Sequence, residues 1–248
     1  MQLDETSVDA LGAPSSLALF LDIDGTLVPI APTPAEVRPS PDLPRLLTRA
    51  AAELGNALAI VSGREITSID QVTHGIVPYA AGSHGAEFRL GIGQAVLRPG
   101  PQPDIAGLES DVLASLGEWP GLLIEPKRAG LAVHYRKAPA LGPRVRQELQ
   151  ALLARRAQPD LALLQGDHVV EVRSPAHNKG EAVRRIMKET AFHGRSPVFI
   201  GDDVTDEDGF LAVQELGGTA IIVGNRRPTL ATRQVSSVAA VLGLLAKL

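Results

Sequence analysis

The feature that most constrains the fold is the uninterrupted apolar run "LALFL" at residues 17–21, which leads directly into Asp22 and Asp24. An apolar run without polar alternation predicts a strand that is buried on both faces, as in parallel sheets that helices cover on each side. Two carboxylates at the end of such a strand repel each other, and burial adds to the cost. The rest of the chain must therefore supply something that offsets this charge.

Further short apolar runs alternate with amphipathic segments of helical length, and this alternation indicates a parallel α/β sheet. The first helix is expected to have Ser40 as its N-cap and Pro41 as its first residue, and to end before Gly55. The expected strands lie at 17–24, 57–63, 77–85, 197–203 and 219–224, and the expected helices at 40–55, 64–75, 178–192 and 206–218, before a last helix that closes the chain.

The middle of the chain has a different pattern and is expected to form an inserted unit. The segment "PGPQPD" at 99–104 has the composition of a linker, and residues 121–136 predict two strands around a turn at 128–130. Helices are expected at 105–117 and 140–157, and two further strands at 161–166 and 168–173. The fold class that follows is α/β: a Rossmann-like parallel sheet core at 1–100 and 175–248, with a small α+β cap domain inserted at 101–174.

Composition excludes several classes of function. The chain has 248 residues, of which 44% are hydrophobic and 21% charged, as is ordinary for a globular protein. Its net charge of −4 gives no electrostatic footprint for nucleic acid or a membrane surface, and the absence of cysteine excludes disulfides and thiolate metal sites. The N-terminal residues lack the features of a signal peptide, and no apolar run approaches the ~20 residues that span a bilayer. We expect a monomeric cytoplasmic protein without nucleic-acid or membrane partners.

Four polar clusters follow the ends of predicted strands, at 22–26, 62–64, 82–85 and 201–203. The carboxyl ends of parallel strands share one edge of a sheet, where open α/β sheets bind their ligands. This edge would bring together four carboxylates that repel one another unless a cation lies among them, namely those of Asp22, Asp24, Asp202 and Asp203. Oxygen ligands, without cysteine or paired histidines, favour Mg²⁺ over Zn²⁺.

A lysine and a serine complete a set of groups that suits phosphoryl transfer. Lys179 begins a predicted helix, where a solvated lysine is the ordinary alternative, but beside the aspartates it would neutralise charge. One aspartate could attack phosphorus, and the other could donate a proton to the leaving oxygen and then activate water. A metal, Ser62 and Lys179 would hold the oxygens of the phosphoryl group.

Seven short motifs carry a resemblance to a known family. "DIDGT", "VSGR", "NKG" and "GDDVTDED" occur in this order and resemble the four motifs of the haloacid dehalogenase-like phosphatase superfamily. More narrowly, "GSHGAE", "EPKRAGLAVHYR", "HVVEVR" and "GDDVTDEDGF" resemble the trehalose-6-phosphate phosphatase family. The resemblance covers nearly the whole chain after the first 16 residues, to which we assign no role.

The resemblance implies an activity and a role for each matching residue. It implies a Mg²⁺-dependent phosphatase that hydrolyses trehalose 6-phosphate to trehalose and phosphate through an aspartyl-phosphate, the last step of trehalose biosynthesis. Asp22 matches the nucleophile and Asp24 the general acid and base, while Ser62 and Lys179 match the phosphate-binding positions. The implied metal ligands are the Asp22 carboxylate, the Asp24 carbonyl and Asp202, and the residues that would orient the metal's shell are Asp203 and Asp206.

In the family that this chain resembles, a mobile cap reads the sugar. The implied substrate-binding residues are Arg64, His84, Glu87, Glu125, Lys127, His134, Arg136 and Glu171. From spacing alone, Glu125 and Lys127 lie two apart on a predicted strand and would share one face, which is usually a solvated, cross-paired surface. The resemblance is what favours sugar recognition at these positions.

Three other functions remain open to the sequence alone. The same chemistry could act on sucrose phosphate or another sugar phosphate, and residues 125–136 would decide between these substrates. A phospho-accepting signalling module also clusters Asp, a hydroxyl residue and Lys, but such modules are shorter, lack an inserted cap and lack the second carboxylate of "DID". A catalytically inactive binding module is disfavoured because every motif position is filled.

Overall fold

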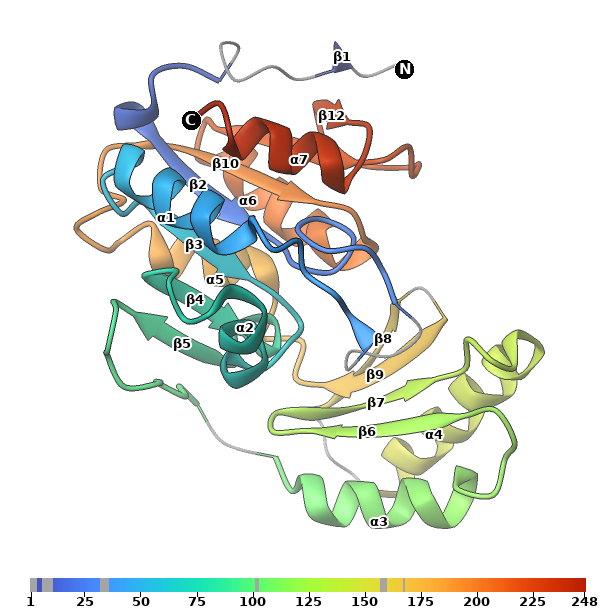
Figure 1. The fold of residues 1–248 in the computed structure, drawn as a ribbon. Coiled ribbons are helices and arrows are strands. Elements are labelled where there is room, and N and C mark those ends of the chain that lie inside the picture. Colours follow the sequence, from blue (N-terminus) through green and yellow to red (C-terminus); the bar gives the residue numbers. More distant parts are fainter. Residues whose placement is uncertain (1–3, 6–10, 32–35, 101–102, 157–159, 167) are drawn as a thin grey trace. The chain divides into compact units, whose positions relative to one another are not determined.

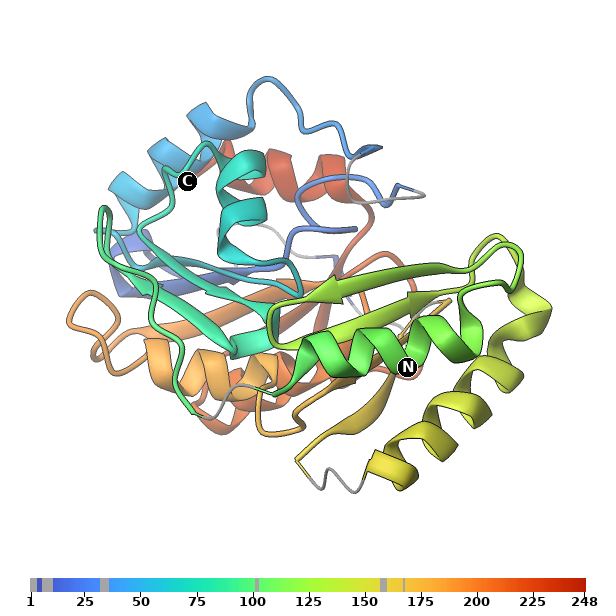
Figure 2. The same ribbon diagram turned by 90° about the horizontal axis from the view of Figure 1, so that it is seen from below.

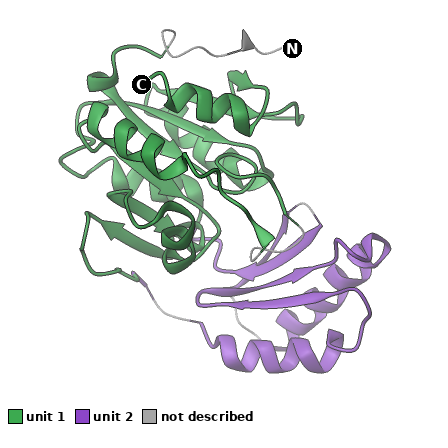
Figure 3. Cartoon of the chain, viewed as in Figure 1, with its two compact units in different colours: residues 1–98, 178–248 green, residues 99–177 purple. Residues whose placement is uncertain are grey.

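A computed structural model of the chain describes residues 4–5, 11–31, 36–100, 103–156, 160–166 and 168–248. The chain forms two compact units, one made of Met1–Arg98 with Asn178–Leu248 and the other of Pro99–His177 (Figure 3). The sequence placed the limits of the insertion at 101 and 174. None of the helices within the described ranges combines the length and apolar character that a membrane crossing requires.

The first unit is built on a sheet in which the strand order reverses at the centre. Its order is β1-β12-β11-β10-β2-β3-β4-β5, and every pairing is parallel except that of β4 with β5. The strands are β1 (Asp4–Glu5), β2 (Leu17–Leu21), β3 (Leu58–Val61), β4 (Tyr79–Gly82), β5 (Glu87–Leu90), β10 (Ser196–Gly201), β11 (Thr219–Val223) and β12 (Arg233–Val235). All five residues of β2 are buried, which confirms the prediction from its apolar run.

Because the chain runs outward from β2 to β3 and β4 on one side, and from β10 to β11 and β12 on the other, β2 and β10 are neighbours at a topological switch point (Figure 1). Loops at the carboxyl ends of such neighbouring strands diverge, and they leave a crevice in which ligands bind. Asp22 directly follows β2, and Asp202 directly follows β10. The topology therefore explains why two aspartates 180 positions apart in the sequence meet.

Helices cover both faces of this sheet, as the two-sided burial of β2 requires. Residues of α1 (Leu43–Glu53), α2 (Ile66–Thr73) and α7 (Val238–Leu245) pack into one apolar cluster, and those of α5 (Lys179–Ile186) and α6 (Glu207–Glu215) into another. In Figure 2 the blue, cyan and red helices lie on one side of the sheet and the orange helices on the other.

Four local features differ from the sequence-based expectation. Helix α1 begins at Leu43 rather than at Pro41, because the Ser40 hydroxyl accepts a hydrogen bond from the Asp42 amide in a turn that precedes the helix. The short strands β1, β5 and β12 were not predicted. Strand β5 follows a turn in which Ser83 and His84 have φ values of 48° and 57°, and this turn reverses the chain so that β5 pairs with β4.

The second unit is a four-stranded antiparallel sheet with two helices on one face. The strand order is β6-β7-β9-β8, and the elements are β6 (Leu123–Lys127), β7 (Gly130–His134), β8 (Ala162–Gly166), β9 (Val169–Arg173), α3 (Ile105–Leu116) and α4 (Gly142–Arg156). Alternate residues of β7 and β9, including Leu131 and Val172, pack against both helices. The predicted hairpin turn, helices and strands of this segment are confirmed.

Candidate active site

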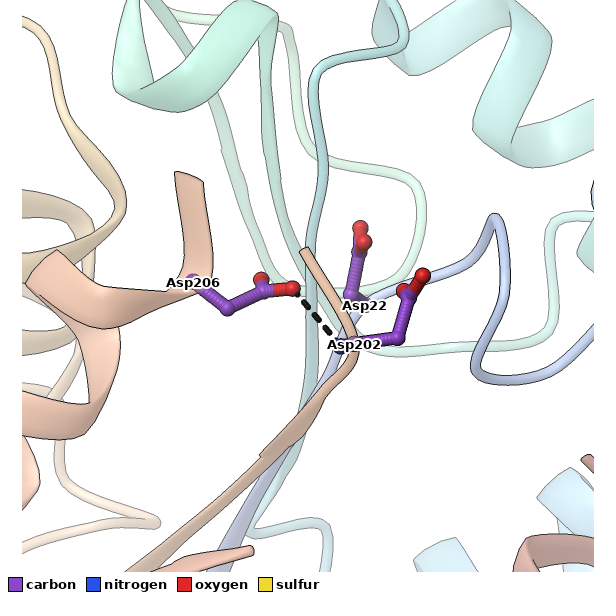
Figure 4. Close-up of side chains that lie close together, drawn as sticks. All are labelled: Asp22, Asp202 and Asp206. Atoms are coloured by element: carbon purple, nitrogen blue, oxygen red, sulfur yellow. Dashed lines mark hydrogen bonds between the residues drawn. The ribbon is translucent and has the colours of Figure 1, made fainter. Parts of the chain in front are cut away.

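Three carboxylates converge at the switch point of the first unit. One oxygen each from Asp22, Asp202 and Asp206 lie within 4.8 Å of one another, which makes this a group that could hold a metal ion among the residues that the structure describes (Figure 4). Asp206 ends the short 3₁₀ turn η6 (Val204–Asp206), just after β10. The tight cluster thus contains Asp206 in place of Asp24 and Asp203, which the sequence had predicted to join it.

Lys179 lies against this cluster. It is the first residue of α5, and the Asn178 side chain caps the helix by accepting the Glu181 amide hydrogen at 2.9 Å. The Lys179 ammonium lies 2.6 Å from an Asp206 oxygen and 3.0 Å from an Asp22 oxygen, and the side chain is 2% exposed. Lys179 is therefore not a solvated lysine. Three carboxylates and one ammonium leave a formal charge of −2, which a divalent cation would balance.

Asp206 has contacts that suit a positioning role. One of its oxygens accepts a hydrogen bond from the Lys179 ammonium. The other accepts hydrogen bonds from the backbone amides of Asp202 and Asp203, each at 2.9 Å. Asp203 in turn caps η6, because its side chain accepts the Asp206 amide in a reciprocal capping box. Since donors of the chain occupy both oxygens of Asp206, its contribution is to fix the loop that carries Asp202.

Burial sets the electrostatics of the cluster. It raises the pKa of Asp22 to about 7, since the opposing effect of Lys179 is smaller than that of burial with Asp206 and Asp24. Burial and the neighbouring Asp22 and Asp206 raise the pKa of Asp202 to about 8. Burial alone would lower the pKa of Lys179, but the Asp206 and Asp22 carboxylates outweigh it and raise that pKa. The cluster therefore favours an added positive charge.

The donor set fits a hard divalent cation such as Mg²⁺. The Oδ1 atom of Asp22 is buried and has no hydrogen-bond partner among the described residues, although an unpaired buried carboxylate oxygen is costly. Each of the three side chains in the cluster offers a carboxylate oxygen as a metal ligand, which is the ligand type that Mg²⁺ prefers. Asp22 and Asp202, with the predicted Asp24 carbonyl, are the residues that would hold it.

Asp24 is held at the edge of the cluster by Arg64. The guanidinium forms a two-pronged pair with the Asp24 carboxylate, with both N···O distances at 2.7 Å, and a third contact joins it to the Ser68 hydroxyl at 3.0 Å. The Asp24 side chain remains 40% exposed, whereas that of Arg64 is 8% exposed. Arg64, which the sequence predicted to bind substrate, here orients the predicted general acid.

The clusters after β3 and β4 lie at the same edge of the sheet. Ser62 is buried, and its hydroxyl accepts the Arg64 amide hydrogen at 3.3 Å. The His84 amide donates to the Ser62 carbonyl at 2.9 Å, and the His84 ring lies directly over Gly63, where a Cβ atom would be 2.6 Å from Nε2. The topology thus brings the serine and histidine motifs together, as predicted.

Glu87 has contacts that favour a structural role. One carboxylate oxygen accepts the Ile66 amide hydrogen at 3.1 Å, at the start of α2, and the other pairs with Arg98 at 3.1 Å. The residue is 2% exposed. The resemblance implies in addition that Glu87 binds substrate.

The second unit carries its own charged cluster on the face opposite α3 and α4. Strand β7 presents Gly130 and Ala132 on this face, so longer side chains from β6 and β9 meet across them. The Lys127 ammonium lies 3.0 Å from Glu171 and 3.9 Å from Glu125, and His134 Nε2 lies 2.7 Å from Glu125. Four predicted substrate-binding residues are therefore brought together: Glu125, Lys127, His134 and Glu171.

Two positions of this unit differ from the sequence-based set. Arg136 lies beyond the end of β7, in a turn, and is exposed. Arg173 was not predicted, but its Nε donates to Glu171 at 3.1 Å, and its guanidinium also donates to the His177 carbonyl. The signal was available in the sequence, because residues 169, 171 and 173 alternate onto one face of β9.

Comparison with solved structures identifies the fold of the chain. The C-terminal domain of trehalose-6-phosphate phosphatase from C. albicans superposes with a TM-score of 0.84 over 99% of this chain and 97% of that chain, at 24% identity. A haloacid dehalogenase-like hydrolase from Bacteroides thetaiotaomicron gives 0.66 over 94% and 98%, at 13% identity. At such identities the likeness shows the fold, which is that of the haloacid dehalogenase-like hydrolases.

Comparison of sequences then gives the family. The trehalose-phosphatase family model matches residues 20–238. A probable trehalose-phosphate phosphatase of Sinorhizobium fredii is 41% identical over 232 residues, which cover 93% of this chain and 87% of the relative. The trehalose-6-phosphate phosphatase of Escherichia coli K12 is 37% identical over 212 residues, covering 84% and 77%. The chain belongs to the trehalose-phosphatase family, and it is a phosphoric monoester hydrolase.

Proposed function

We propose that this chain hydrolyses trehalose 6-phosphate to trehalose and phosphate in a Mg²⁺-dependent reaction that passes through an aspartyl-phosphate on Asp22. One observation carries the proposal: the buried Asp22 carboxylate lies at the switch point, 3.0 Å from Lys179, and has one oxygen without a hydrogen-bond partner among the described residues. The choice of trehalose 6-phosphate as the substrate follows from the names of the relatives. Mg²⁺, held by Asp22, Asp202 and the Asp24 carbonyl, would neutralise phosphate charge and hold Asp22 in its ionised form.

In the first step, an oxygen of the Asp22 carboxylate attacks phosphorus, and the bond from phosphorus to the sugar oxygen breaks. Asp24 donates its proton to that leaving oxygen, which departs as the hydroxyl of trehalose. Lys179 and Ser62 hold the oxygens of the phosphoryl group, and Lys179 balances the charge that the attack brings into the buried site.

In the second step, water attacks the phosphorus of the aspartyl-phosphate while Asp24 accepts the proton of that water. The bond between phosphorus and the Asp22 oxygen breaks, so that phosphate leaves and the carboxylate is restored. Uncatalysed phosphate-monoester hydrolysis is slow enough that accelerations reach ~10²¹, so both positioning and charge stabilisation must be large. The hydrogen bonds of Asp206 and the pair of Arg64 with Asp24 provide the positioning.

We assign the choice of substrate to the charged cluster of the inserted unit. Carboxylates accept hydrogen bonds from sugar hydroxyls, and lysine and arginine donate to them. The Lys127 ammonium already pairs with the carboxylates of Glu125 and Glu171. A bound sugar would therefore replace some of these ion pairs with hydrogen bonds to its own hydroxyls.

Phosphate release from a panel of sugar phosphates tests the substrate. We expect kcat/KM for trehalose 6-phosphate to exceed that for sucrose 6-phosphate and glucose 6-phosphate by at least about 10²-fold, because a site that pairs with hydroxyls rejects sugars that leave its groups unpaired. Chelation with EDTA should abolish release, and Mg²⁺ should restore it better than Ca²⁺ or Zn²⁺. Preference for another sugar phosphate would reassign the substrate and leave the chemistry in place.

The variant Asp22→Asn tests the mechanism. It should lower kcat by at least about 10³-fold, or ~4 kcal/mol, because an amide cannot form the phosphoenzyme. Asparagine is nearly isosteric, so the thermal unfolding midpoint should confirm that the protein is folded. The same substitution at an exposed N-cap, Asp42→Asn, is the matched control and should leave kcat unchanged. A pure Asp22→Asn sample with near wild-type activity would refute the covalent route.

A further inference from the structure

Arg226 binds the loop that carries Asp202 and has no role in the proposed bond-breaking steps. It lies between β11 and β12, in a segment that none of the family motifs covers. Its Nε donates to the Asp202 carbonyl at 3.0 Å, one terminal nitrogen to the Asp203 carbonyl at 3.2 Å, and the other to the Pro228 carbonyl at 2.9 Å. The guanidinium also forms an ion pair with Glu207. One side chain therefore joins two consecutive peptides of the acidic loop to the neighbouring segment.

Hydrogen bonds hold the backbone of Asp202 on both sides of the residue. Its amide hydrogen is accepted by Asp206 at 2.9 Å, and its carbonyl accepts Arg226 at 3.0 Å, so the peptide groups on both sides of the residue are fixed. Its carboxylate is further held by the Thr26 hydroxyl at 3.3 Å. The backbone of Asp202 is therefore held at both of its peptide groups, and the Thr26 hydroxyl holds its carboxylate.

Glu207 holds Arg226 in place for this role. It is the first residue of α6, and its second carboxylate oxygen accepts the Leu230 amide hydrogen at 2.7 Å. The Arg226 and Glu207 side chains are 26% and 20% exposed, so the pair is largely shielded from water. The planar guanidinium can bind several carbonyl and carboxylate oxygens at fixed angles, whereas a lysine ammonium is a point charge on a flexible chain.

We propose that Arg226 is a positioning residue for the divalent cation: it fixes the Asp202 carboxylate in ligand geometry before the cation arrives. This inference rests on the proposed function, because it concerns the cation that the carboxylates are proposed to hold. The physical reason is preorganisation. If the binding-competent arrangement is populated for only a fraction of the time, the apparent dissociation constant rises by the inverse of that fraction.

Calorimetric titration of Mg²⁺ alone into the metal-free full chain tests the proposal. Arg226→Gln should raise the Mg²⁺ dissociation constant at least about 10-fold, as expected if Asp202 keeps its ligand geometry for about a tenth of the time. Arg226→Lys should give an intermediate Mg²⁺ dissociation constant, because lysine keeps the positive charge but lacks the planar set of donors of the guanidinium. At saturating Mg²⁺, kcat for phosphate release should stay within about 3-fold of wild type, since the cation then selects the competent arrangement.

Arg227→Gln is the matched control. Arg227 is the exposed neighbour of Arg226, and it donates to the Arg226 carbonyl at 2.7 Å and to Gln234 of β12 at 2.9 Å, so neither of these contacts reaches the acidic loop. Its variant should bind Mg²⁺ within about 2-fold of wild type. If Arg226→Gln does not fold, Glu207→Gln keeps the arginine but loses the ion pair that orients it, and it should weaken Mg²⁺ binding by about 3-fold or more.

Two results would overturn the proposal while leaving the proposed function in place. One is unchanged Mg²⁺ affinity in folded Arg226→Gln, or in folded Glu207→Gln where the arginine variant does not fold. The other is an equal loss in Arg227→Gln, which would show a general disturbance of the segment. A wild-type protein that binds no Mg²⁺ is a different outcome, seen before any variant is compared, and it would overturn the proposed metal dependence together with this inference.

Discussion

At the scale of single residues, the active-site carboxylates destabilise the fold that holds them. Asp22 and Asp202 have pKa values raised from 3.8 to about 7 and about 8, chiefly by burial, so each charged form is costly in the folded protein. Between pH 3.8 and these raised values, the two carboxyl groups are protonated in the folded protein and ionised in the unfolded chain, so the unfolded chain holds fewer protons. Stability of the metal-free protein must therefore fall as the pH rises through this window, which is the opposite of the usual behaviour of a salt-bridged aspartate.

This sign gives a prediction about pH. The unfolding midpoint of the metal-free protein in EDTA should fall by at least about 2 °C between pH 5.5 and pH 8.5, and Mg²⁺ should remove much of the fall by binding the ionised carboxylates. Thermal melts of wild type and Asp202→Asn at matched pH values check it, because asparagine does not titrate and should flatten the curve. A metal-free midpoint that rises over this range in wild type relative to Asp202→Asn would contradict it.

At the scale of elements, the Asp202 carboxylate in the loop after β10 lies against Gly25 in the loop after β2. Gly25 has a φ of +80°, and a Cβ atom there would lie 2.1 Å from an Asp202 carboxylate oxygen. Any side chain at this position must therefore displace the carboxylate as well as strain the backbone. The "DIDGT" motif contains its glycine for this reason, in addition to the conformational freedom that glycine provides.

Gly25→Ala should accordingly weaken Mg²⁺ binding by at least about 10-fold and reduce stability by about 1–2 kcal/mol. Gly217→Ala separates the two effects. Gly217 has a φ of +75°, and a Cβ atom there would meet none of the described residues within 4 Å, so its variant should lose similar stability and keep full Mg²⁺ affinity. Calorimetric titration with urea unfolding measures both. Equal Mg²⁺ affinity in the two folded variants would show that the close approach has no bearing on the metal.

At the scale of the whole molecule, we propose that the two units have separate tasks, one in the chemistry and the other in the choice of substrate. The carboxylates, Lys179 and Ser62 all belong to the first unit, whereas the charged cluster of β6, β7 and β9 belongs to the second. Because the second unit contributes no group to the proposed bond-breaking steps, a change in its cluster should affect the recognition of a sugar far more than the chemistry itself.

Lys127→Ala tests this division of tasks. It should lower kcat/KM for trehalose 6-phosphate by about 10²-fold, or about 2.7 kcal/mol, as expected for a charged hydrogen bond left unmade. The loss on p-nitrophenyl phosphate should stay within about 3-fold, because that leaving group has no hydroxyls to bind. Lys137→Ala, at an exposed lysine in the turn after β7, is the matched control. A proportional loss of kcat/KM on both substrates would show that Lys127 does not act in sugar recognition.

Much of this molecule follows from local sequence. Apolar runs fixed the positions of the central strands, because burial on both faces leaves no polar alternation, and the helices and hairpin of the insertion followed from their periodicity. The short strands β5 and β12 gave no such signal, since three or four residues are too few to show a pattern. Sequence reasoning also placed Lys179 at a helix start beside the aspartates.

Only the tertiary structure decided how the charged groups pair. The sequence could not tell that Asp206 rather than Asp24 or Asp203 joins Asp22 and Asp202, because that choice depends on the backbone of η6. Nor could it show that Arg226 binds a carbonyl 24 positions away. Strand and helix formation depends on the order of apolar residues along the chain, which the sequence states directly. Hydrogen bonding and ion pairing depend on distances between atoms, which exist only once the sheet has brought distant segments together.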